Sequence, residues 1–430
     1  MLGGGTFVSQ TEKRLPGSYI NFVSAAKASA SLAERGYVAV PMILDWGVDG
    51  EVFTVTNGDF YKNSREIFGY DYAHDKMKNL RDLFMYAETA YIYKLGAGAS
   101  KASNAFAEAK CAGTRGNSIR IVIAETTDAY EVSTYLDLTL VDKQTVTQAS
   151  ELVANDFVTF KADAELVETA STPLTGGTNG TVNSAAWQEA LEAFESYSFN
   201  VIGAVTTDEE IKKLVVEWTK WMRDDIGVKF QAVVYNYAAD DKAIINVVSK
   251  PKVGGEAELV YWVAGAEAGC AVNASLTNKV YNGEYDVDVK VSQTRLIEAL
   301  DKGEFIFHRV GDDVRVLEDI NSKVTITEME GDEFRYNQNI RVCDQIAMDI
   351  ATLFNTKYLG VVPNDNAGRI SLWNDIVKHH QELQQLRAIE DFEPEDVTVE
   401  QGETKKSVVV NDKITTVNAM AQMFMTVVVA

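Results

Sequence analysis

The last nine residues of the chain, QMFMTVVVA (422–430), contain no charge, no glycine and no proline. An apolar segment of high β propensity pairs readily with another chain when it is left exposed. The rest of the sequence is acidic, because 63 Asp and Glu residues against 40 Lys and Arg residues give a formal net charge of -23. The fold must therefore either bury this segment or present it to another subunit.

Bulk properties limit the class of protein. With 430 residues the chain is long enough for several domains and a sizeable core. We expect no membrane span and no signal peptide, because no apolar run reaches 18 residues and no basic stretch precedes an apolar one at the start. The net negative charge argues against nucleic acid as a partner. Three widely spaced cysteines predict free thiols in a reducing compartment: Cys111, Cys270 and Cys343.

Residues 1–24 are predicted to form an N-terminal arm. A glycine-rich start leads to a turn at Pro16-Gly17. A strand of high β propensity should follow, made of Tyr19, Ile20, Asn21, Phe22 and Val23.

Residues 25–95 together with 184–265 are predicted to form an α/β core domain. Residues 37–44 predict a buried strand, at an edge or bulge because of Pro41. Helices are expected at 59–69, capped near Asn57 or Asp59 and ended by Gly69, and at 77–90. After a helix capped by Ser184, two strands (199–205 and 230–237) flank a helix (208–227), which implies a parallel pair. Residues 257–272 predict a further strand and a helix of small residues.

Residues 96–183 are predicted to form an inserted, mostly β domain. GNSIRIVIAE (116–125) and TYLDLTLVD (134–142) alternate polar with apolar residues, as half-buried antiparallel strands do. The segment closes with a glycine-rich loop, PLTGGTNG (173–180).

Residues 266–417 are predicted to form an α+β C-terminal domain, and 418–430 a C-terminal arm strand. The domain should hold a strand–turn–strand around Gly311 and long helices at 339–360 and 369–389. A second strand–turn–strand spans VTVEQGETKKSVVVND (397–412). The predicted fold class is thus a multidomain α+β (mixed α/β) protein.

No motif for catalysis, cofactor or metal binding emerges. PLTGGTNG lacks the Lys-Ser/Thr of a phosphate loop, and no serine lies in GxSxG. His379 and His380 are adjacent and cannot share a metal as an i, i+4 pair can, so a buried or interface role is favoured. We expect no catalytic, cofactor-binding or metal-binding residues.

The two ends remain the strongest feature. A strand added to a neighbour's sheet edge would link subunits through main-chain hydrogen bonds. The alternative, equally open on physical grounds, is that both ends pair within their own chain.

The order of segments resembles a known family. The chain resembles contractile tail sheath proteins of phages of Gram-positive bacteria. The segments that carry the resemblance are, in order, GGGTF (3–7), RLPGSYINF (14–22), ERGYVAVPMILDWG (34–47) and the β insertion closed by LTGGTNG. They resemble the form found in defective prophages and phage-tail-like bacteriocins, and the likeness covers essentially the whole chain.

The resemblance implies a structural role, without enzymatic activity or cofactor. Hexameric rings would stack helically around an inner tube and contract to drive it through the target envelope. Implied partners are further copies of the chain, the tube protein, and baseplate and terminator or collar proteins, with no nucleic acid and no membrane insertion. Assembly would occur in the bacterial host cytoplasm, before the sheath joins a virion tail or a released particle.

The resemblance also places residues. Tyr19–Val23 would be the inter-subunit N-terminal arm strand, and 397–401 and 406–412 candidates for the sheet that receives arms. The inserted domain would lie outside, away from the tube. The C-terminal arm strand would lie within 420–429 and include Met423, Phe424, Met425, Thr426, Val427, Val428 and Val429.

A tube contact is expected on a C-terminal helix. We choose 369–389, where Arg369, Lys378 and Arg387 balance nearby acids in an otherwise negative chain. An ordinary amphipathic core helix is an equal alternative.

Two other classes compete with the sheath. One is an α/β nucleotide-binding enzyme of unknown substrate. The other is an adhesin or surface-layer protein, which the missing signal peptide opposes.

Overall fold

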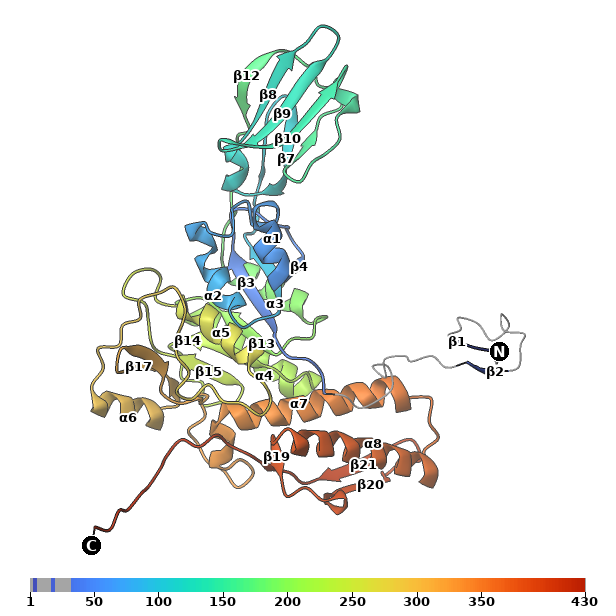
Figure 1. Cartoon of the computed structure of the whole chain (residues 1–430), viewed down its shortest axis with the longest axis vertical. Helices are drawn as coiled ribbons and strands as arrows, with labels where there is room; N and C mark the ends of the chain where they lie inside the picture. The colour runs from blue at the N-terminus through green and yellow to red at the C-terminus, as the bar shows by residue number, and fades with distance from the viewer. Residues whose placement is uncertain (1–2, 6–16, 20–31, 430) are drawn as a thin grey trace. The chain divides into compact units, whose positions relative to one another are not determined.

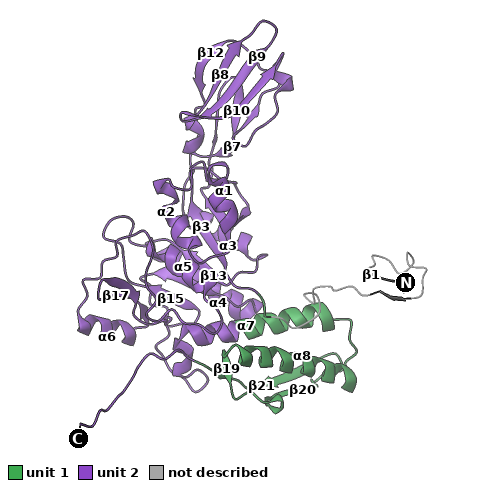
Figure 2. Ribbon diagram, in the orientation of Figure 1, with its two compact units in different colours: residues 1–33, 345–417 green, residues 34–344, 418–430 purple. Residues whose placement is uncertain are grey.

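The computed structural model describes residues 3–5, 17–19 and 32–429 (Figure 1). It is a mixed α+β structure with several sheets, which confirms the predicted fold class. Contacts divide the chain into two compact units, residues 1–33 with 345–417 and residues 34–344 with 418–430 (Figure 2). The five-part division predicted from the sequence stays a prediction. No helix of the described residues is long and apolar enough to cross a membrane.

The larger unit, residues 34–344 with 418–430, is built on a seven-stranded sheet of order β16-β15-β14-β13-β3-β5-β4. All neighbouring pairs are parallel except β4 with β5. The predicted parallel strand pair is confirmed as β13 and β14. The strands are β3 (Tyr37–Ile43), β4 (Val52–Thr56), β5 (Thr89–Leu95), β13 (Val201–Ala204), β14 (Gln231–Tyr235), β15 (Ile244–Val247) and β16 (Glu304–Phe305).

Helices bury apolar side chains against the sheet in two separate clusters. One cluster includes α2 and α5, the other α3 and α4. Close packing of α5 requires a glycine, because a Cβ at Gly265 would lie 2.1 Å from the Leu83 carbonyl oxygen. The helices are α1 (Asn57–Phe68), α2 (Lys78–Phe84), α3 (Ser184–Phe194), α4 (Glu209–Trp221) and α5 (Leu259–Gly269).

The predicted edge position of Pro41 is wrong, because β3 lies between β13 and β5. Strand β13 pairs with β3 only at Val38 and Ala39, so Pro41 lies beyond the shared ladder. The missing N–H of Pro41 therefore removes no hydrogen bond from the ladder between β3 and β13.

Local signals located both ends of α1 and the start of α3 to within about one residue, but α2 ends at Phe84, six residues before the predicted end at 90. Gly69 ends α1 in the left-handed conformation, as predicted. The start is capped one residue earlier than expected, by Thr56, whose hydroxyl accepts from the Asp59 amide. Asn183, not Ser184, caps α3. Residues 257–272 contain the single helix α5, Leu259–Gly269, and no strand.

Residues 96–183 hold two antiparallel sheets, of order β10-β9-β8-β12 and β11-β7-β6. Alternation in 119–125 is confirmed, with Ile119, Ile121 and Ile123 buried. The segment 134–142 is a hairpin and not one strand, because Asp137 turns the chain at φ 53°. The strands are β6 (Lys101–Ser103), β7 (Ala107–Ala112), β8 (Ile119–Glu125), β9 (Tyr130–Leu136), β10 (Thr139–Val146), β11 (Val158–Phe160) and β12 (Thr169–Pro173).

The remaining part of the larger unit holds α6 (Gln293–Asp301) and the predicted hairpin, β17 (Phe307–Val310) with β18 (Asp313–Val316). Helix α7 (Asn337–Leu353) carries the boundary between the units. It ends earlier than predicted, in a π-helical turn over Phe354–Tyr358.

The smaller unit contains α8 (Asn366–Gln385) and two two-stranded antiparallel sheets. One pairs β19 (Ile389–Glu390) with β22 (Thr415–Thr416), the other β20 (Val397–Gln401) with β21 (Val408–Asp412). The predicted strand–turn–strand of 397–412 is confirmed. Near the start of the chain, β1 (Gly3–Gly5) pairs in parallel with β2 (Gly17–Tyr19).

Candidate assembly site

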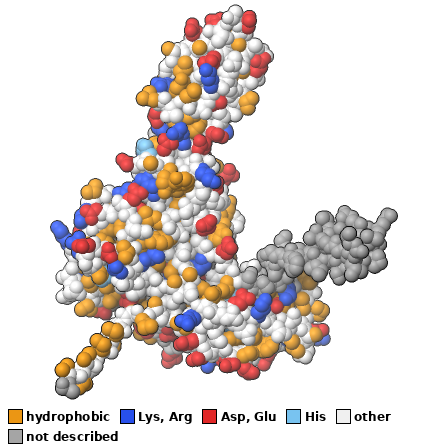
Figure 3. Space-filling view, in the orientation of Figure 1, with side chains coloured by type: hydrophobic (Ala, Val, Ile, Leu, Met, Phe, Trp, Pro, Cys, Tyr) orange, Lys and Arg blue, Asp and Glu red, His pale blue; other side chains and the backbone are white. Residues whose placement is uncertain are grey.

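The C-terminal segment of the chain is exposed. Residues 420–429 belong to no strand, and every one of them is exposed. Phe424 is 91% exposed and Val428 87%. Figure 3 shows a row of hydrophobic side chains along this segment. A run of large apolar side chains left in water is a typical sign of an interaction site. Among the described residues, no strand pairs with this segment.

A sheet with free edges lies in the smaller unit. Strands β20 and β21 form a ladder of five residue pairs, and no third strand of the described residues joins either edge. The β20 side packs on α8, where the Trp373 indole donates to the Val397 carbonyl over 2.9 Å. Strand β21 is more open, with Val409 45% exposed. A short sheet with unpaired edges accepts an added strand by its main-chain groups.

The predicted N-terminal arm is only partly described. Tyr19 is the last residue of β2. Ile20, Asn21, Phe22 and Val23 lie outside the described residues. Their role stays a prediction.

The three cations of the predicted tube contact do not share one face. Lys378 lies nine positions after Arg369 on α8, about two and a half turns at roughly 100° per residue, so the two side chains leave opposite sides of the helix. Lys378 is exposed and lies 3.9 Å from Glu382, whereas Arg369 is half-buried and donates to Asn364. Arg387 lies beyond the helix end with φ 60°.

The solvent face of α8 is nearly uncharged. Its exposed residues recur at helical spacing and include Lys378 as their one ionised side chain: Ile370, Asn374, Lys378, Gln381 and Gln385. Such a face suits a broad contact with another protein better than binding of a small ion.

The adjacent histidines are buried core residues, as the sequence favoured. His379 Nε2 lies 2.9 Å from Asp349 Oδ2, and His380 Nε2 lies 2.8 Å from Asp412 Oδ2. Both rings are completely buried. Across the described ranges of the chain, no group of three or more metal-binding side chains comes together.

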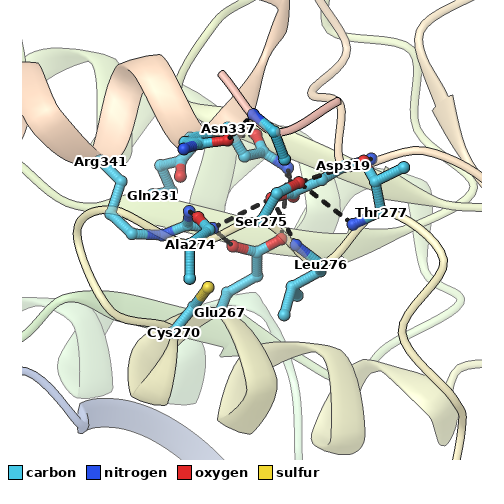
Figure 4. Close-up of polar contacts among 12 residues, drawn as sticks. Gln231, Glu267, Cys270, Ala274, Ser275, Leu276, Thr277, Asp319, Asn337 and Arg341 are labelled. Atoms are coloured by element: carbon cyan, nitrogen blue, oxygen red, sulfur yellow. Dashed lines mark hydrogen bonds and ion pairs between the residues drawn. The ribbon is translucent and has the colours of Figure 1, made fainter. Parts of the chain in front are cut away.

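A buried polar cluster holds the first turns of α7, and no pattern in the sequence predicted it. Arg341 Nη2 lies 2.6 Å from Glu267 Oε2 and 3.3 Å from Asp319 Oδ2, with all three side chains 1% exposed. Asn337 donates to Asp319 and Glu267 and accepts from Gln231 (Figure 4). These residues lie far apart in sequence, so no local motif marks them.

The charges in this cluster shift one another. Burial and the nearby Asp319 carboxylate raise the pKa of Glu267 well above its ordinary value, against the pull of Arg341. Burial alone would also raise the pKa of Asp319, but Arg341 and hydrogen bonds from its neighbours outweigh burial and lower it. Glu267 is therefore the carboxyl group of the pair that takes up a proton first.

The root of the C-terminal segment lies on the larger unit. The Ala419 amide donates to the Gln338 side-chain oxygen over 3.0 Å, and Gln338 is a buried residue of α7 next to Asn337. A cavity of about 280 Å³ is lined by this root and by polar residues of the body: Ser275, Thr277, Glu318, Asp319, Tyr336, Gln338, Asn418, Ala419, Ala421 and Gln422.

An exposed apolar segment and an open sheet in one chain define a protein suited to joining other subunits. Models of the phage tail sheath match along the chain: the domain III N-terminal region (residues 35–95), the beta-sandwich domain (96–179), the central domain (180–322) and the C-terminal domain (330–430). The chain belongs to the phage tail sheath protein family. The members are structural proteins, so this chain is not an enzyme, and the nucleotide-binding alternative is set aside.

Individual relatives agree. Phage-like element PBSX protein XkdK of Bacillus subtilis (strain 168) is 32% identical over 99% of both chains. The solved sheath tail protein of Desulfitobacterium hafniense is 34% identical, with a TM-score of 0.78 over 90% of this chain and 93% of that one. The helical sheath of the anti-feeding prophage in its contracted state shares the fold at 13% identity, with a TM-score of 0.57 over 97% of this chain and 99% of that one.

Proposed function

We propose that this chain is the subunit of a contractile tail sheath. Hexameric rings stack helically around an inner tube, and contraction drives that tube through the target cell envelope. The observation that carries the proposal is the exposed apolar segment 420–429 in a chain that also holds an open two-stranded sheet. Membership of the tail sheath family and the fold shared with a contracted sheath support it.

The arms connect subunits by strand addition. Residues 423–429 of one subunit, and Tyr19–Val23 of another, extend the β20–β21 sheet of a third. Each main-chain hydrogen bond contributes about 0.5–1.5 kcal/mol net, so five bonds per arm provide several kcal/mol before ordering costs. The globular bodies stay free to move because the connection is made by extended chain.

Contraction needs no nucleotide or cofactor in this mechanism. The extended lattice is held out of equilibrium, and contraction proceeds as the subunit bodies exchange one set of contacts for a more stable one. The partners are other copies of the chain, the tube protein, and baseplate and terminator or collar proteins. Assembly takes place in the bacterial host cytoplasm, before the sheath joins a virion tail or a released phage-tail-like particle.

The domains take different places in the sheath. Residues 96–183 face outward, 25–95 with 184–265 form the core, and 266–417 form the domain that receives arms. The arms themselves are 1–24 and 418–430. Helix α8 meets the inner tube, with Lys378 on its solvent face as the charged contact and Arg369 and Arg387 near its two ends.

Negative-stain electron microscopy of the purified protein tests the proposal. Wild type is compared with a truncation that ends at Asn418, each alone, in high salt, and with tube protein. Tubular assemblies from wild type and a folded monomer from the truncation are expected. Circular dichroism and thermal melting of the truncation serve as the folding control. Compact monomers from both proteins in every condition would exclude a sheath.

A further inference from the structure

At the start of the C-terminal arm, Val417 is hydrogen-bonded within the smaller unit and Ala419 within the larger unit. Val417 N–H donates to the Ala388 carbonyl over 3.1 Å, next to the β19–β22 pair, within the smaller unit. Ala419 N–H donates to Gln338 over 3.0 Å within the larger unit. The chain therefore passes from one unit to the other between residues 417 and 418.

The anchor on the larger unit is firm. Gln338 is 4% exposed, and its neighbour Asn337 is bonded to the buried Glu267 and Asp319 carboxylates. Arg341, one turn further along α7, is held by the same carboxylates (Figure 4). The first turn of α7, which carries the buried Gln338, is therefore held in the body of the larger unit.

The arm root is held weakly by comparison. Among the described residues, the bond from Ala419 to Gln338 is the single hydrogen bond that involves the segment beyond Val417. The net effect of one neutral hydrogen bond is roughly a two- to tenfold bias in an equilibrium. Ala421 and Gln422 are exposed and border the 280 Å³ cavity without filling it.

We propose that residues 418–422 form a releasable latch, docked on Gln338 in the extended sheath and detached in the contracted one. Detachment frees five residues, up to about 16 Å of extended chain at roughly 3.3 Å per residue. This slack lets the arm keep its place in a neighbour's sheet while the two bodies move apart or turn. The inference rests on the proposed function and adds a device that permits contraction.

A reversible bridge across the cavity tests the latch. Thr277→Cys and Ala421→Cys place thiols on the body and the arm side of the same cavity, for linking with the short thiol crosslinker dibromobimane. Sheaths are assembled on tubes from unlinked or linked subunits, and contraction on warming is scored by electron microscopy. The linked sheath is expected to assemble but to contract at least tenfold less often than the unlinked one. Full contraction of the linked sheath would overturn the latch.

Controls separate the latch from the sheath function. Wild type treated with the same reagent shows any effect of the native cysteines, and each single cysteine variant shows any effect of attachment without bridging. If neither wild type nor unlinked subunits assemble with tube protein, the proposed function itself fails.

A second variant tests the latch without crosslinking. Gln338→Met keeps the side-chain size but removes the acceptor for Ala419, and should speed contraction about two- to tenfold. Gln144→Met is the matched control, because Gln144 likewise accepts from a backbone amide, that of Val153, within residues 96–183. Equal contraction rates for Gln338→Met and wild type would also overturn the latch.

Discussion

The Arg341 guanidinium lies 2.6 Å from a carboxylate oxygen of Glu267, and both side chains are 1% exposed. The pair joins α7 to α5 within the larger unit, with Asp319 as a second carboxylate. A buried ion pair adds little stability over apolar packing, but removing one partner leaves the others buried without compensation.

Arg341→Met should therefore lower the free energy of unfolding by about 3–5 kcal/mol. Urea unfolding of the unassembled subunit, followed by tryptophan fluorescence, measures the change. Arg309→Met is the matched control, because Arg309 is exposed and should change stability by less than about 0.5 kcal/mol. A loss below about 1 kcal/mol for Arg341→Met would show that the cluster does not support the fold.

Asp82 should make the subunit less stable as pH rises from about 4 to 7. Burial raises the pKa of this carboxyl group to about 6, although it accepts hydrogen bonds from Glu284 N and Tyr281 Oη. The folded state thus binds the proton more tightly than the unfolded state, so the contribution is full below pH 3.8 and lost above about pH 6. The loss is about 3 kcal/mol at roughly 1.36 kcal/mol per pKa unit.

Asp82→Asn removes this titration and should flatten the stability curve between pH 4 and 7. Urea unfolding at half-unit pH steps measures it. Asp71→Asn is the contrast, because a hydrogen bond from Arg65 lowers the pKa of the exposed Asp71. That variant should leave the slope above pH 4.5 as in wild type. Equal slopes for wild type and Asp82→Asn over this window would contradict the role of Asp82.

Most helices and strands could be predicted because their signals, such as alternation of polar and apolar residues and helix-ending glycines, lie within the element itself. Alternation located β8, and Gly69 marked the end of α1 by its left-handed conformation. The same reasoning failed where burial is uniform. Helix α5 has ten buried residues and no polar face. The periodicity of its apolar residues therefore could not distinguish a helix from a buried strand.

Contacts between residues far apart in the chain could not be predicted from the sequence. Nothing local joins Glu267, Asp319 and Arg341, or shows that Gln338 holds Ala419. The apolar arm was readable from composition because an uncharged terminal segment is unusual in an acidic chain. Its receiving strands could be proposed only through resemblance to a family.

Proline substitutions test strand pairing by the C-terminal arm. Proline cannot donate to a ladder, and alternate residues of an added strand point their N–H groups toward the edge. Val427→Pro and Val428→Pro should therefore differ, with one of them reducing sheath assembly far more than the other. Both subunits should melt as wild type does, because these residues are 69% and 87% exposed. Val427→Ala and Val428→Ala, which keep the donor, are the controls, and assembly by both proline variants at the wild-type level would rule out this pairing.

Charge reversal tests the contact between α8 and the tube. Lys378→Glu with Arg387→Glu should hinder assembly on tubes if the tube surface is acidic, and the effect should weaken in high salt. Lys378 lies on the solvent face of α8, whereas Arg387 lies beyond the helix end. The two single variants should therefore differ, with Lys378→Glu reducing assembly on tubes more than Arg387→Glu. Lys302→Glu, an exposed lysine of the larger unit, controls for net charge. Sedimentation of subunits with preformed tubes gives the bound fraction, and an unchanged fraction for the double variant would refute the contact.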